Sequence, residues 1–353
     1  MSADECWPEG GFEHLGRCPV CGDKGRVLLY ADLSDRVFHA APGRWRMHRC
    51  GGCGSAYLDP RPNEATIHLA YRDYHTHRSP AEDRKRSAAV RFGRSLLHGY
   101  LNSRFRYDFR PALRVGVRVV PLVPGGSGLA SMHVRALPLP DGEGRLLDVG
   151  CGNGEFLARM RAAGWQVEGL DPDPAAVELA QRAGLAVDEG TLSSVEPRLA
   201  RYDAITLSHV IEHVHDPLAT LQACYAALRP GGVIWIDTPN LEARGHRRFG
   251  RDWFPLEPPR HLAIFTASSL RSLLERAGFT ALPDPPVVLS AFRWSYRLSN
   301  ALRLNASKPF EAPPSIGRVL AAHALIDDLR TLARPREGEE LVAMALRPES
   351  PGG

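Results

Sequence analysis

A glycine-rich turn between a buried strand and a helix is the feature that most limits what this chain can fold into. Residues 145–157 read Arg-Leu-Leu-Asp-Val-Gly-Cys-Gly-Asn-Gly-Glu-Phe-Leu, and residues 169–172 read Gly-Leu-Asp-Pro. The first stretch predicts a strand, a tight turn and a helix start, and the second predicts a neighbouring strand that ends in an acid. In an α/β sheet such a turn holds a nucleoside cofactor at the carboxyl ends of the strands.

The spacing of the glycines distinguishes two classes of cofactor. A dinucleotide site has the pattern G-x-G-x-x-G, whose third glycine lets the helix pack close to the strand. Here the glycines are Gly150, Gly152 and Gly154, and Glu155 stands where the dinucleotide pattern has its third glycine. A carboxylate at that place would oppose a pyrophosphate at the helix N-terminus. The pattern therefore disfavours a dinucleotide.

The turn resembles motif I of the class I S-adenosylmethionine-dependent methyltransferases. Residues 202–214 and 228–237 are similar to the fourth strand of that family and to its fifth strand with the preceding loop. With the acid-ended strand at 166–171, four motifs follow one another in the family's order. The resemblance implies an α/β fold with a Rossmann-like seven-stranded methyltransferase sheet, helices on both faces, and S-adenosyl-L-methionine as the cofactor.

The resemblance also implies roles for individual residues. Asp148 is expected to order the turn near the methionine end of the cofactor. Asp171 is expected to accept the two ribose hydroxyls, for which a carboxylate is a suitable bidentate acceptor. The end of the third strand is expected beside the adenine. The complete predicted cofactor set is Asp148, Gly150, Cys151, Gly152, Gly154, Asp171, Pro172, Thr191, Leu192, Ser208 and His209.

Two Cys-x-x-Cys turns near the N-terminus predict a metal site. Cys18 and Cys21 form one pair, Cys50 and Cys53 form the other, and each pair is followed by a glycine. Four thiolates make a closed tetrahedral site, for which structural Zn²⁺ is the usual metal. A redox pair is the rival interpretation, but two copies that bracket a strand-rich segment favour a zinc ribbon, with His48 as an alternative ligand.

The first residues and the cysteines of the chain predict its cellular compartment. The first residues are acidic and lack an apolar stretch, so we expect no signal peptide and a cytoplasmic protein. In that reduced compartment, paired Cys-x-x-Cys favours metal over a disulfide. No run of about 18 uncharged apolar residues occurs, so no membrane span is predicted.

A zinc module ahead of a methyltransferase core resembles two groups. One comprises sugar and natural-product methyltransferases, with relatives in polysaccharide gene clusters, and the other comprises ribosomal-RNA guanine methyltransferases.

The predicted domains are a zinc ribbon at 1–62, a basic helical segment and linker at 63–140, and a core at 141–353 that carries an insertion at 291–336. Strands are expected near 145–150, 166–171, 186–190, 202–208, 232–238, 287–290 and 341–347, and helices near 154–163, 174–183, 216–228 and 267–277. The proline- and glycine-rich stretch 121–144 is predicted to be the linker.

The segment 78–118 is strongly basic. It holds eleven Lys and Arg against three Asp and Glu, which gives a charge of +8. A solvated helix is one interpretation, and a surface for an anionic substrate, for lipid headgroups or for RNA are the others. The whole chain has a charge of only +4, which does not by itself indicate nucleic acid. Peripheral membrane contact by the amphipathic helix 316–330 is disfavoured because Asp327 and Asp328 interrupt it.

The catalytic candidates follow the fourth and fifth strands, because ligands bind beyond the carboxyl ends of parallel strands. Glu212 and His213 resemble the Glu-His pair that small-molecule methyltransferases place near the acceptor, and a histidine can take a proton as the methyl group moves. His261 ends an aromatic, proline-rich loop at 251–262 and is a second acid–base candidate, while Arg260 could meet a phosphate. The Asn/Asp-Pro-Pro-Tyr/Phe pattern typical of base N-methylation is not found here.

The sequence thus predicts methyl transfer from S-adenosyl-L-methionine to a small oxygen-rich acceptor: a sugar, a nucleotide-linked sugar or a natural-product intermediate. Whether oxygen or carbon is methylated stays open. The catalytic candidates are His213, His261 and Glu212. The alternatives are an RNA methyltransferase that uses the ribbon and the basic segment, and a non-catalytic cofactor-binding protein.

Overall fold

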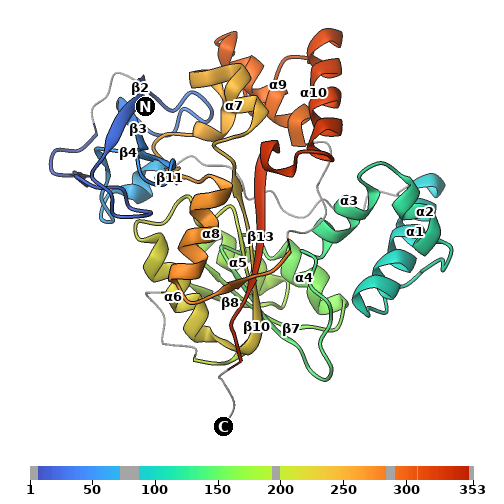
Figure 1. Cartoon of the computed structure of the whole chain (residues 1–353). Coiled ribbons are helices and arrows are strands. Elements are labelled where there is room, and N and C mark those ends of the chain that lie inside the picture. Colours follow the sequence, from blue (N-terminus) through green and yellow to red (C-terminus); the bar gives the residue numbers. More distant parts are fainter. Residues whose placement is uncertain (1–6, 72–86, 193–198, 284–290, 308, 350–353) are drawn as a thin grey trace.

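A seven-stranded sheet forms the centre of the molecule in the computed structural model (Figure 1). The structure describes residues 7–71, 87–192, 199–283, 291–307 and 309–349. The strand order is β12-β13-β10-β9-β6-β7-β8, with β13 antiparallel to both of its neighbours and the other pairs parallel. The strands are β6 (Arg145–Val149), β7 (Gln166–Asp171), β8 (Ala186–Glu189), β9 (Tyr202–Ser208), β10 (Leu228–Pro239), β12 (Thr280–Ala281) and β13 (Glu340–Leu346). The predicted α/β methyltransferase fold is confirmed.

Helices bury both faces of this sheet, because side chains alternate along each strand. Leu147, Ile205 and Ile234 pack on one face with α6 (Pro217–Ala227) and α8 (Ala267–Arg276). Leu146 and Trp235 point to the other face, with α4 (Glu155–Ala162) and α5 (Pro174–Arg182). The predicted helices therefore occur where they were expected.

Side-chain caps fix where three of these helices begin. Asp173 and Asp216 each accept a backbone N–H of the first turn and are followed by proline, and Thr266 caps α8 in the same way. A cap of this kind satisfies a backbone donor that has no partner within the helix. The loops before these helices, which surround the candidate site, are fixed in turn.

A smaller four-stranded sheet is built partly from the core. Its order is β11-β4-β3-β2. The strands β2 (Arg26–Leu33), β3 (Trp45–Cys50) and β4 (Ala56–Leu58) come from the N-terminal segment, whereas β11 (Ala263–Ile264) follows the loop after β10. A further pair, β1 (Phe12–Glu13) with β5 (Arg61–Pro62), closes the N-terminal part. The N-terminal module and the core therefore share a sheet.

The segment predicted to be a linker is structured. It contains η2 (Val120–Leu122) and α3 (Gly126–His133), after η1 (Ile67–Tyr71), α1 (Ala88–Phe105) and α2 (Gly116–Val119). Val134 and Leu137 are fully buried against the face that α4 and α5 cover. Gly126 is required because a Cβ there would lie 2.3 Å from the Val120 carbonyl oxygen. The linker prediction for 121–144 was wrong because these glycines serve a tight turn into a packed helix.

The region after β10 carries the remaining elements: α7 (Arg244–Phe249), η3 (Gly250–Asp252), η4 (Phe254–Leu256), α9 (Ala291–Arg303), α10 (Arg318–Thr331) and η5 (Pro335–Glu337). The sixth strand of the large sheet was expected at 287–290, which lies outside the described residues. In the structure, the sixth strand of that sheet in chain order is β12. Asp327 does not interrupt α10 but is buried and accepts hydrogen bonds from Arg244 and Tyr296. Among the helices of the described residues, none is long and apolar enough to cross a bilayer.

Candidate functional site at the carboxyl edge of the sheet

The glycine turn after β6 has a backbone that only glycine adopts easily. Gly150, Gly152 and Gly154 all have positive φ angles, of 69°, 54° and 77°. A Cβ on Gly150 would lie 2.5 Å from Val210, and one on Gly154 would lie 2.4 Å from Leu185. A Cβ on Gly152 would meet nothing within 4 Å, so this glycine faces open space. The turn therefore packs tightly at its ends and leaves an open cradle at its middle.

The acid at the end of β7 lies directly beside this cradle. Asp171 accepts a hydrogen bond of 2.7 Å from the backbone N–H of Gly152 and one of 3.0 Å from that of Asp173. Its carboxylate is thus fixed next to the turn. Its expected role, to accept the two ribose hydroxyls, stays a prediction.

Asp148 lies beneath the turn with one oxygen available. Its Oδ1 accepts from Arg135 and, over 2.7 Å, from the Thr206 hydroxyl, whereas Oδ2 is buried and has no hydrogen-bond partner among the described residues. Burial raises the pKa of Asp148, although Arg135 opposes the shift. A buried oxygen without a partner fits a site that takes a polar ligand.

Arg135 is a site residue that the sequence analysis missed. Its guanidinium stacks 3.6 Å from the centre of the Phe156 ring and also contacts Asp148 and Thr206. The residue lies just after α3, in the stretch predicted to be a linker. Its positive φ of 50° and its place thirteen residues before Asp148 give no recognisable motif, so only the tertiary structure identifies it.

Other members of the predicted cofactor set surround the turn in different ways. The Cys151 thiol is buried and would lie 2.6 Å from a Cβ on Gly169, so only the Cys151 backbone can reach a cofactor. Thr191 is exposed just after β8, and Leu192 packs partly against the core. Pro172 is exposed after Asp171, and Ser208 ends β9. Their contacts with a cofactor stay predictions.

His209 stands at the end of β9 among three carboxylates. Its Nδ1 lies 3.2 Å from Glu212, and its Nε2 lies 3.7 Å from Asp237 and 3.9 Å from Glu340. The His209 side chain is 46% exposed. Its partial desolvation disfavours the imidazolium, but Asp237 and Glu212 outweigh this and raise the pKa of His209 to about 10. The protonated form is therefore favoured at neutral pH, which makes His209 a poor candidate for the base.

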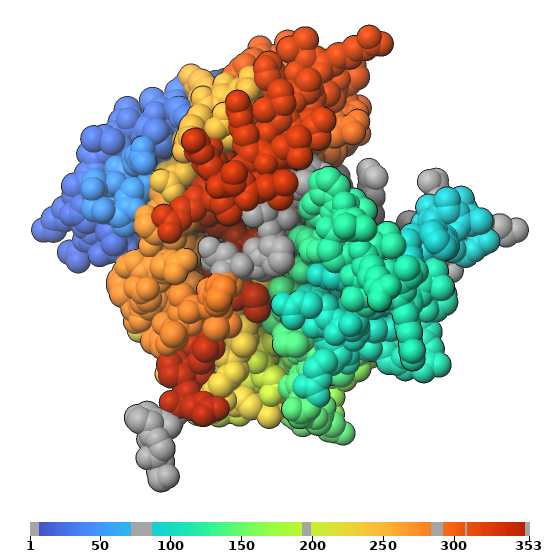
Figure 2. All heavy atoms as spheres, turned by 45° about the vertical axis from the view of Figure 1, so that its right-hand side comes forward, coloured from blue at the N-terminus to red at the C-terminus, as the bar shows by residue number. Residues whose placement is uncertain are grey.

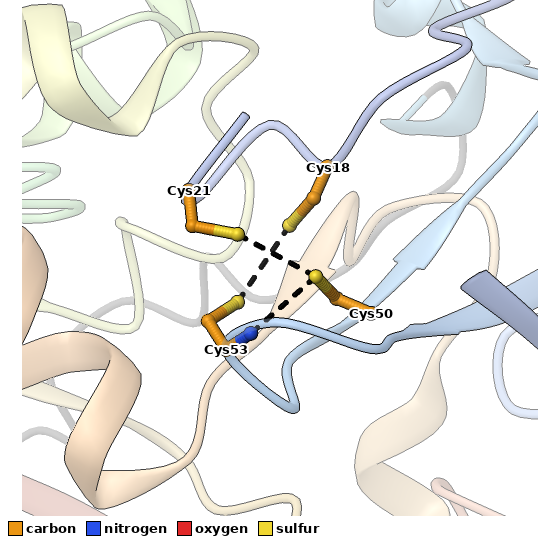
Figure 3. A group of neighbouring side chains, drawn as sticks. All are labelled: Cys18, Cys21, Cys50 and Cys53. Atoms are coloured by element: carbon orange, nitrogen blue, oxygen red, sulfur yellow. Dashed lines mark hydrogen bonds between the residues drawn. The ribbon is translucent and has the colours of Figure 1, made fainter. Parts of the chain in front are cut away.

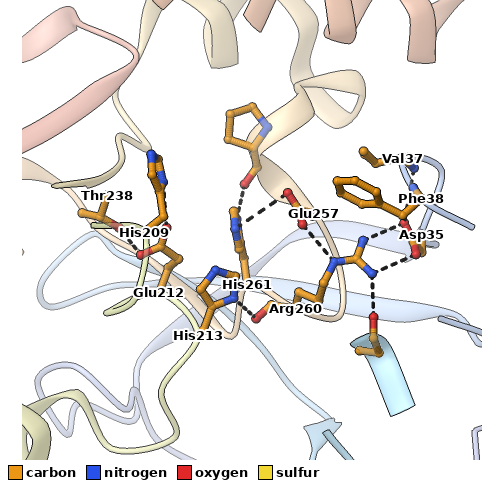
Figure 4. Close-up of polar contacts among 12 residues, drawn as sticks. Asp35, Val37, Phe38, His209, Glu212, His213, Thr238, Glu257, Arg260 and His261 are labelled. Carbon is orange, nitrogen blue, oxygen red and sulfur yellow. Dashed lines mark hydrogen bonds and ion pairs between the residues drawn. The ribbon is translucent and has the colours of Figure 1, made fainter. Parts of the chain in front are cut away.

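Glu212, His213 and His261 form a compact cluster next to His209 (Figure 4). One side-chain oxygen or nitrogen from each lies within 4.8 Å of the others, and the two imidazole rings are 4.7 Å apart. His213 Nδ1 donates to the Arg260 carbonyl over 3.0 Å, and His261 Nδ1 donates to the Pro255 carbonyl over 2.7 Å. Because a carbonyl can only accept, each ring carries its proton on Nδ1, and Nε2 keeps its lone pair.

Burial sets the charge of this cluster. It lowers the pKa of His213, helped by the neighbouring His261, to about 4, and it lowers the pKa of His261 to about 4. Burial alone would raise the pKa of Glu212, but the hydrogen bond from His209 and the nearby histidines lower it to about 2. At neutral pH the cluster therefore holds two neutral imidazoles beside one ionised carboxylate.

Sequence comparison identifies the fold family of this site. A family model described as a methyltransferase domain matches residues 127–283. A protein from Cereibacter sphaeroides strain KD131, named ubiquinone biosynthesis O-methyltransferase, is 32% identical over 174 residues, which are 46% of this chain and 70% of that protein. The chain belongs to the S-adenosylmethionine-dependent methyltransferases.

Other known proteins are more distantly similar. A Methylobacterium nodulans protein with the same name is 29% identical to this methyltransferase over 188 residues, covering 50% of this chain and 76% of that protein. A solved S-adenosylmethionine-dependent methyltransferase from Mesorhizobium loti has a TM-score of 0.41 and 19% identity, and the match covers 61% of this chain and 95% of that one. The family model ends at 283 and begins at 127, so the N-terminal module and α9–α10 lie outside it.

The four predicted metal ligands of the methyltransferase come together in space (Figure 3). Cys18 Sγ lies 3.7 Å from Cys53 Sγ, and Cys21 Sγ lies 3.5 Å from Cys50 Sγ. None of the four forms a disulfide. A tetrahedron with Zn–S bonds of about 2.3 Å has S–S edges of about 3.8 Å, so the cluster has the size that a zinc ion needs. His48, the alternative ligand, is not part of the cluster.

Arg260 is not available for a phosphate, contrary to the possibility raised from the sequence. Its side chain is completely buried and pairs with Asp35 and Glu257, over 2.8 Å and 2.9 Å. Two buried carboxylates leave the guanidinium no face for a ligand. The sequence signal was misleading because the loop 251–262 folds inward against the N-terminal module instead of facing solvent.

Proposed function

We propose that this methyltransferase transfers the methyl group to an oxygen of a small hydroxylated acceptor, such as a sugar, a nucleotide-linked sugar or a natural-product intermediate. The observation that carries the proposal is the pair of adjacent histidines, His213 and His261, whose Nδ1 atoms both contact backbone carbonyls, so that each Nε2 is left as the basic nitrogen. Relatives named O-methyltransferases support oxygen as the methylated atom.

The donor half of the site would be the glycine turn with its acids. Asp171 would bind the ribose hydroxyls, the open cradle at Gly152 would admit the cofactor backbone, and Asp148 with Arg135 would face its methionine end. The partnerless oxygen of Asp148 and the open space at Gly152 are what make the residues fit this cofactor. S-Adenosylmethionine supplies an electrophilic methyl group on a sulfonium when bound.

The acceptor half would be the histidine cluster. A hydroxyl oxygen placed near His213 would form the new O–CH₃ bond while the C–S bond breaks toward sulfur. The hydroxyl proton would pass to His213 Nε2, and the ionised Glu212 would stabilise the imidazolium that results. Holding the acceptor in line contributes to the rate independently of the proton transfer. His209, already protonated, would line the donor side and take no proton.

We also propose that the four cysteines hold one structural zinc ion. A set of four thiolates is closed and leaves no position for water or substrate, so the metal would order the N-terminal module and take no part in the methyl transfer. The glycines after each pair, Gly22 and Gly54, have φ angles of 83° and 76°, which let each turn wrap the metal.

An acceptor panel with mass spectrometry tests the proposal. Purified protein with S-adenosylmethionine carrying a labelled methyl group should transfer the label to the oxygen of a sugar or other small hydroxylated compound. His213→Gln should abolish most of the transfer while leaving S-adenosylhomocysteine binding unchanged. Label that appears only in RNA, or on nitrogen, would contradict the proposal.

RNA is the second candidate because of the exposed basic helices. Figure 2 shows the N-terminal end of α1 projecting from the body, and the first half of α1, with Arg91 and Arg94, is exposed. Two of the arginines nearby, Arg106 and Arg110, already pair with Asp141 and Asp108. RNA methylation predicts binding that weakens steeply with salt, whereas a solvated helix predicts little binding at any salt concentration.

A further inference from the structure

Arg260 is held by the N-terminal module through a buried charge cluster (Figure 4). Its two terminal nitrogens donate to Asp35 over 2.8 and 3.0 Å, and one of them also donates to the Ala70 carbonyl over 2.9 Å. Its Nε donates to Glu257 over 2.9 Å, and its guanidinium lies 4.8 Å from the centre of the Phe38 ring. These four hydrogen bonds to fixed partners constrain the position of the side chain strongly.

Asp35 is itself fixed by the loop that joins β2 and β3. Beside Arg260, its carboxylate accepts from the backbone N–H groups of Val37, Phe38, Ala40 and Ala41. Burial alone would raise the pKa of Asp35, but Arg260 and these donors lower it, so the carboxylate stays ionised. The loop therefore acts as a rigid socket for the guanidinium.

The backbone of Arg260 sets the orientation of His213. Its carbonyl accepts the His213 Nδ1 proton, and the next residues, Leu262 and Ala263, both donate backbone N–H groups to the Glu212 carbonyl. The segment that follows β9 is thus hydrogen-bonded to the loop that carries Arg260. The Tyr71 hydroxyl lies 3.1 Å from the same Nδ1. A shift of that loop would leave this hydroxyl as the remaining partner, and since a hydroxyl can donate as well as accept, the proton would no longer be held on Nδ1.

The side chain of Arg260 also keeps Glu257 away from His261. Glu257 Oε1 bonds to Arg260 at 2.9 Å, whereas Glu257 Oε2 is 3.9 Å from His261 Nε2, beyond hydrogen-bond distance. Burial raises the pKa of Glu257 and the guanidinium opposes the shift, so without Arg260 the carboxyl would more readily take up a proton and donate it to this nitrogen. His261 Nε2 would then be occupied and could not face an acceptor.

We propose that Arg260 and Asp35 are positioning residues for methyl transfer: the N-terminal loop anchors Arg260, which orients His213 through its carbonyl and withholds Glu257 from His261. This inference rests on the proposed function in taking the two histidines as the acceptor side. The N-terminal module is then part of the scaffold of the acceptor site, and not a separate recognition domain. The charged and titratable groups that face the two histidines are Tyr71, His209, Glu212, Glu257 and Arg260.

Histidine nitrogen NMR on the full chain tests this without an acceptor, so its failure is distinguishable from failure of the proposed function. Resonances of ¹⁵N-histidine protein are assigned from His213→Gln and His261→Gln. In the wild type both rings should be neutral Nδ1–H tautomers at pH 7. In Arg260→Gln, His261 Nε2 should shift as a hydrogen bond to Glu257 forms, and its pKa should rise by about one to three units, the usual effect of a newly paired carboxylate.

Three further variants make the result specific. The double variant Asp35→Asn, Arg260→Gln removes one negative and one positive charge, so it leaves no unpaired buried carboxylate at position 35. It should give the same shift of His261 as Arg260→Gln alone. Arg260→Lys keeps the charge and should leave His261 near its wild-type pKa. Arg36→Gln is the matched control, because Arg36 belongs to the same loop and pairs with Asp252 over 2.7 Å; it should change neither histidine.

The outcomes that overturn the proposal are equally definite. If Arg260→Gln and the double variant fold, bind zinc and S-adenosylhomocysteine like the wild type, and keep wild-type tautomers and pKa values at both histidines, Arg260 positions nothing. If neither variant folds, Arg260 serves the stability of the core alone, which also contradicts the proposal.

Discussion

The donor side and the acceptor side of the site are built differently, although they meet at one edge of the sheet. The donor side comes mainly from residues 148–171, a single strand–turn–helix–strand unit. The acceptor side combines the segment after β9, the loop before β11, and a loop of the N-terminal module. In the sequence, Asp35 of that last loop lies 225 residues before Arg260. In the proposed site, cofactor binding is therefore a local property of the chain, whereas acceptor binding depends on the module and the core packing together.

Loss of the metal should produce the largest difference between the two sides. Structural zinc contributes on the order of 10 kcal/mol to the folding of small modules. Cys18→Ser should therefore unfold the N-terminal sheet, free β11 and Asp35, and abolish methyl transfer, while calorimetry still detects S-adenosylhomocysteine binding. Metal analysis of the wild type should find about one zinc per chain. A metal-free protein with full activity would contradict this dependence.

Replacement of the proposed base should affect the acceptor side alone. His213→Gln should lower turnover by about 10²–10⁴-fold, because proton transfer from the acceptor loses its base. Cofactor affinity should stay at the wild-type value. His215→Gln is the control, since His215 is close in sequence but donates to the Pro62 carbonyl outside the cluster. If His213→Gln and His261→Gln both retain full turnover, proximity alone accounts for the reaction.

Replacement of the ribose acid should affect the donor side alone. Asp171→Ala should weaken S-adenosylhomocysteine binding by about 1.5–3 kcal/mol, the range for hydrogen bonds to a charged group. Zinc content and the tautomers of His213 and His261 should not change. Asp173→Asn keeps a capping side chain on α5 and should bind the cofactor normally. Equal losses in both variants would mean that general disruption of the loop, and not the ribose contact, is measured.

Acid should destabilise the acceptor side by a smaller amount. In the folded protein the pKa values of His213 and His261 are about 4, below the ordinary value of 6.5. Between pH 4 and pH 6.5 the unfolded chain therefore binds more protons than the folded protein. Stability from this source is complete above pH 6.5 and is lost as the pH falls toward 4. Urea midpoints at pH 7.5 and 5 should differ less in a His213→Gln, His261→Gln double variant. An unchanged difference would assign the acid sensitivity to other groups.

The contrast also explains what could be predicted from sequence. The glycine turn, Asp148 and Asp171 follow one another with fixed spacing, and the cysteine pairs have the spacing of a zinc site. Local patterns were therefore sufficient to predict that Asp171 lies beside the turn and that the four cysteines gather. Arg135 was not predicted as a site residue because it lies in a stretch whose prolines and glycines suggest a linker. Arg260 was misassigned because nothing in 251–262 reveals that Asp35 will lie against it. Long-range pairing of buried charges leaves no periodic pattern in the chain.

A structure of the protein with S-adenosylhomocysteine and the methylated product is the most direct test of the account. We predict that the ether oxygen of the product lies within hydrogen-bond distance of Nε2 of His213 or His261, with the ribose on Asp171 and Arg260 still paired with Asp35. A product bound against the arginines of α1, or a pocket at the edge of the sheet in which neither histidine faces the product, would contradict it.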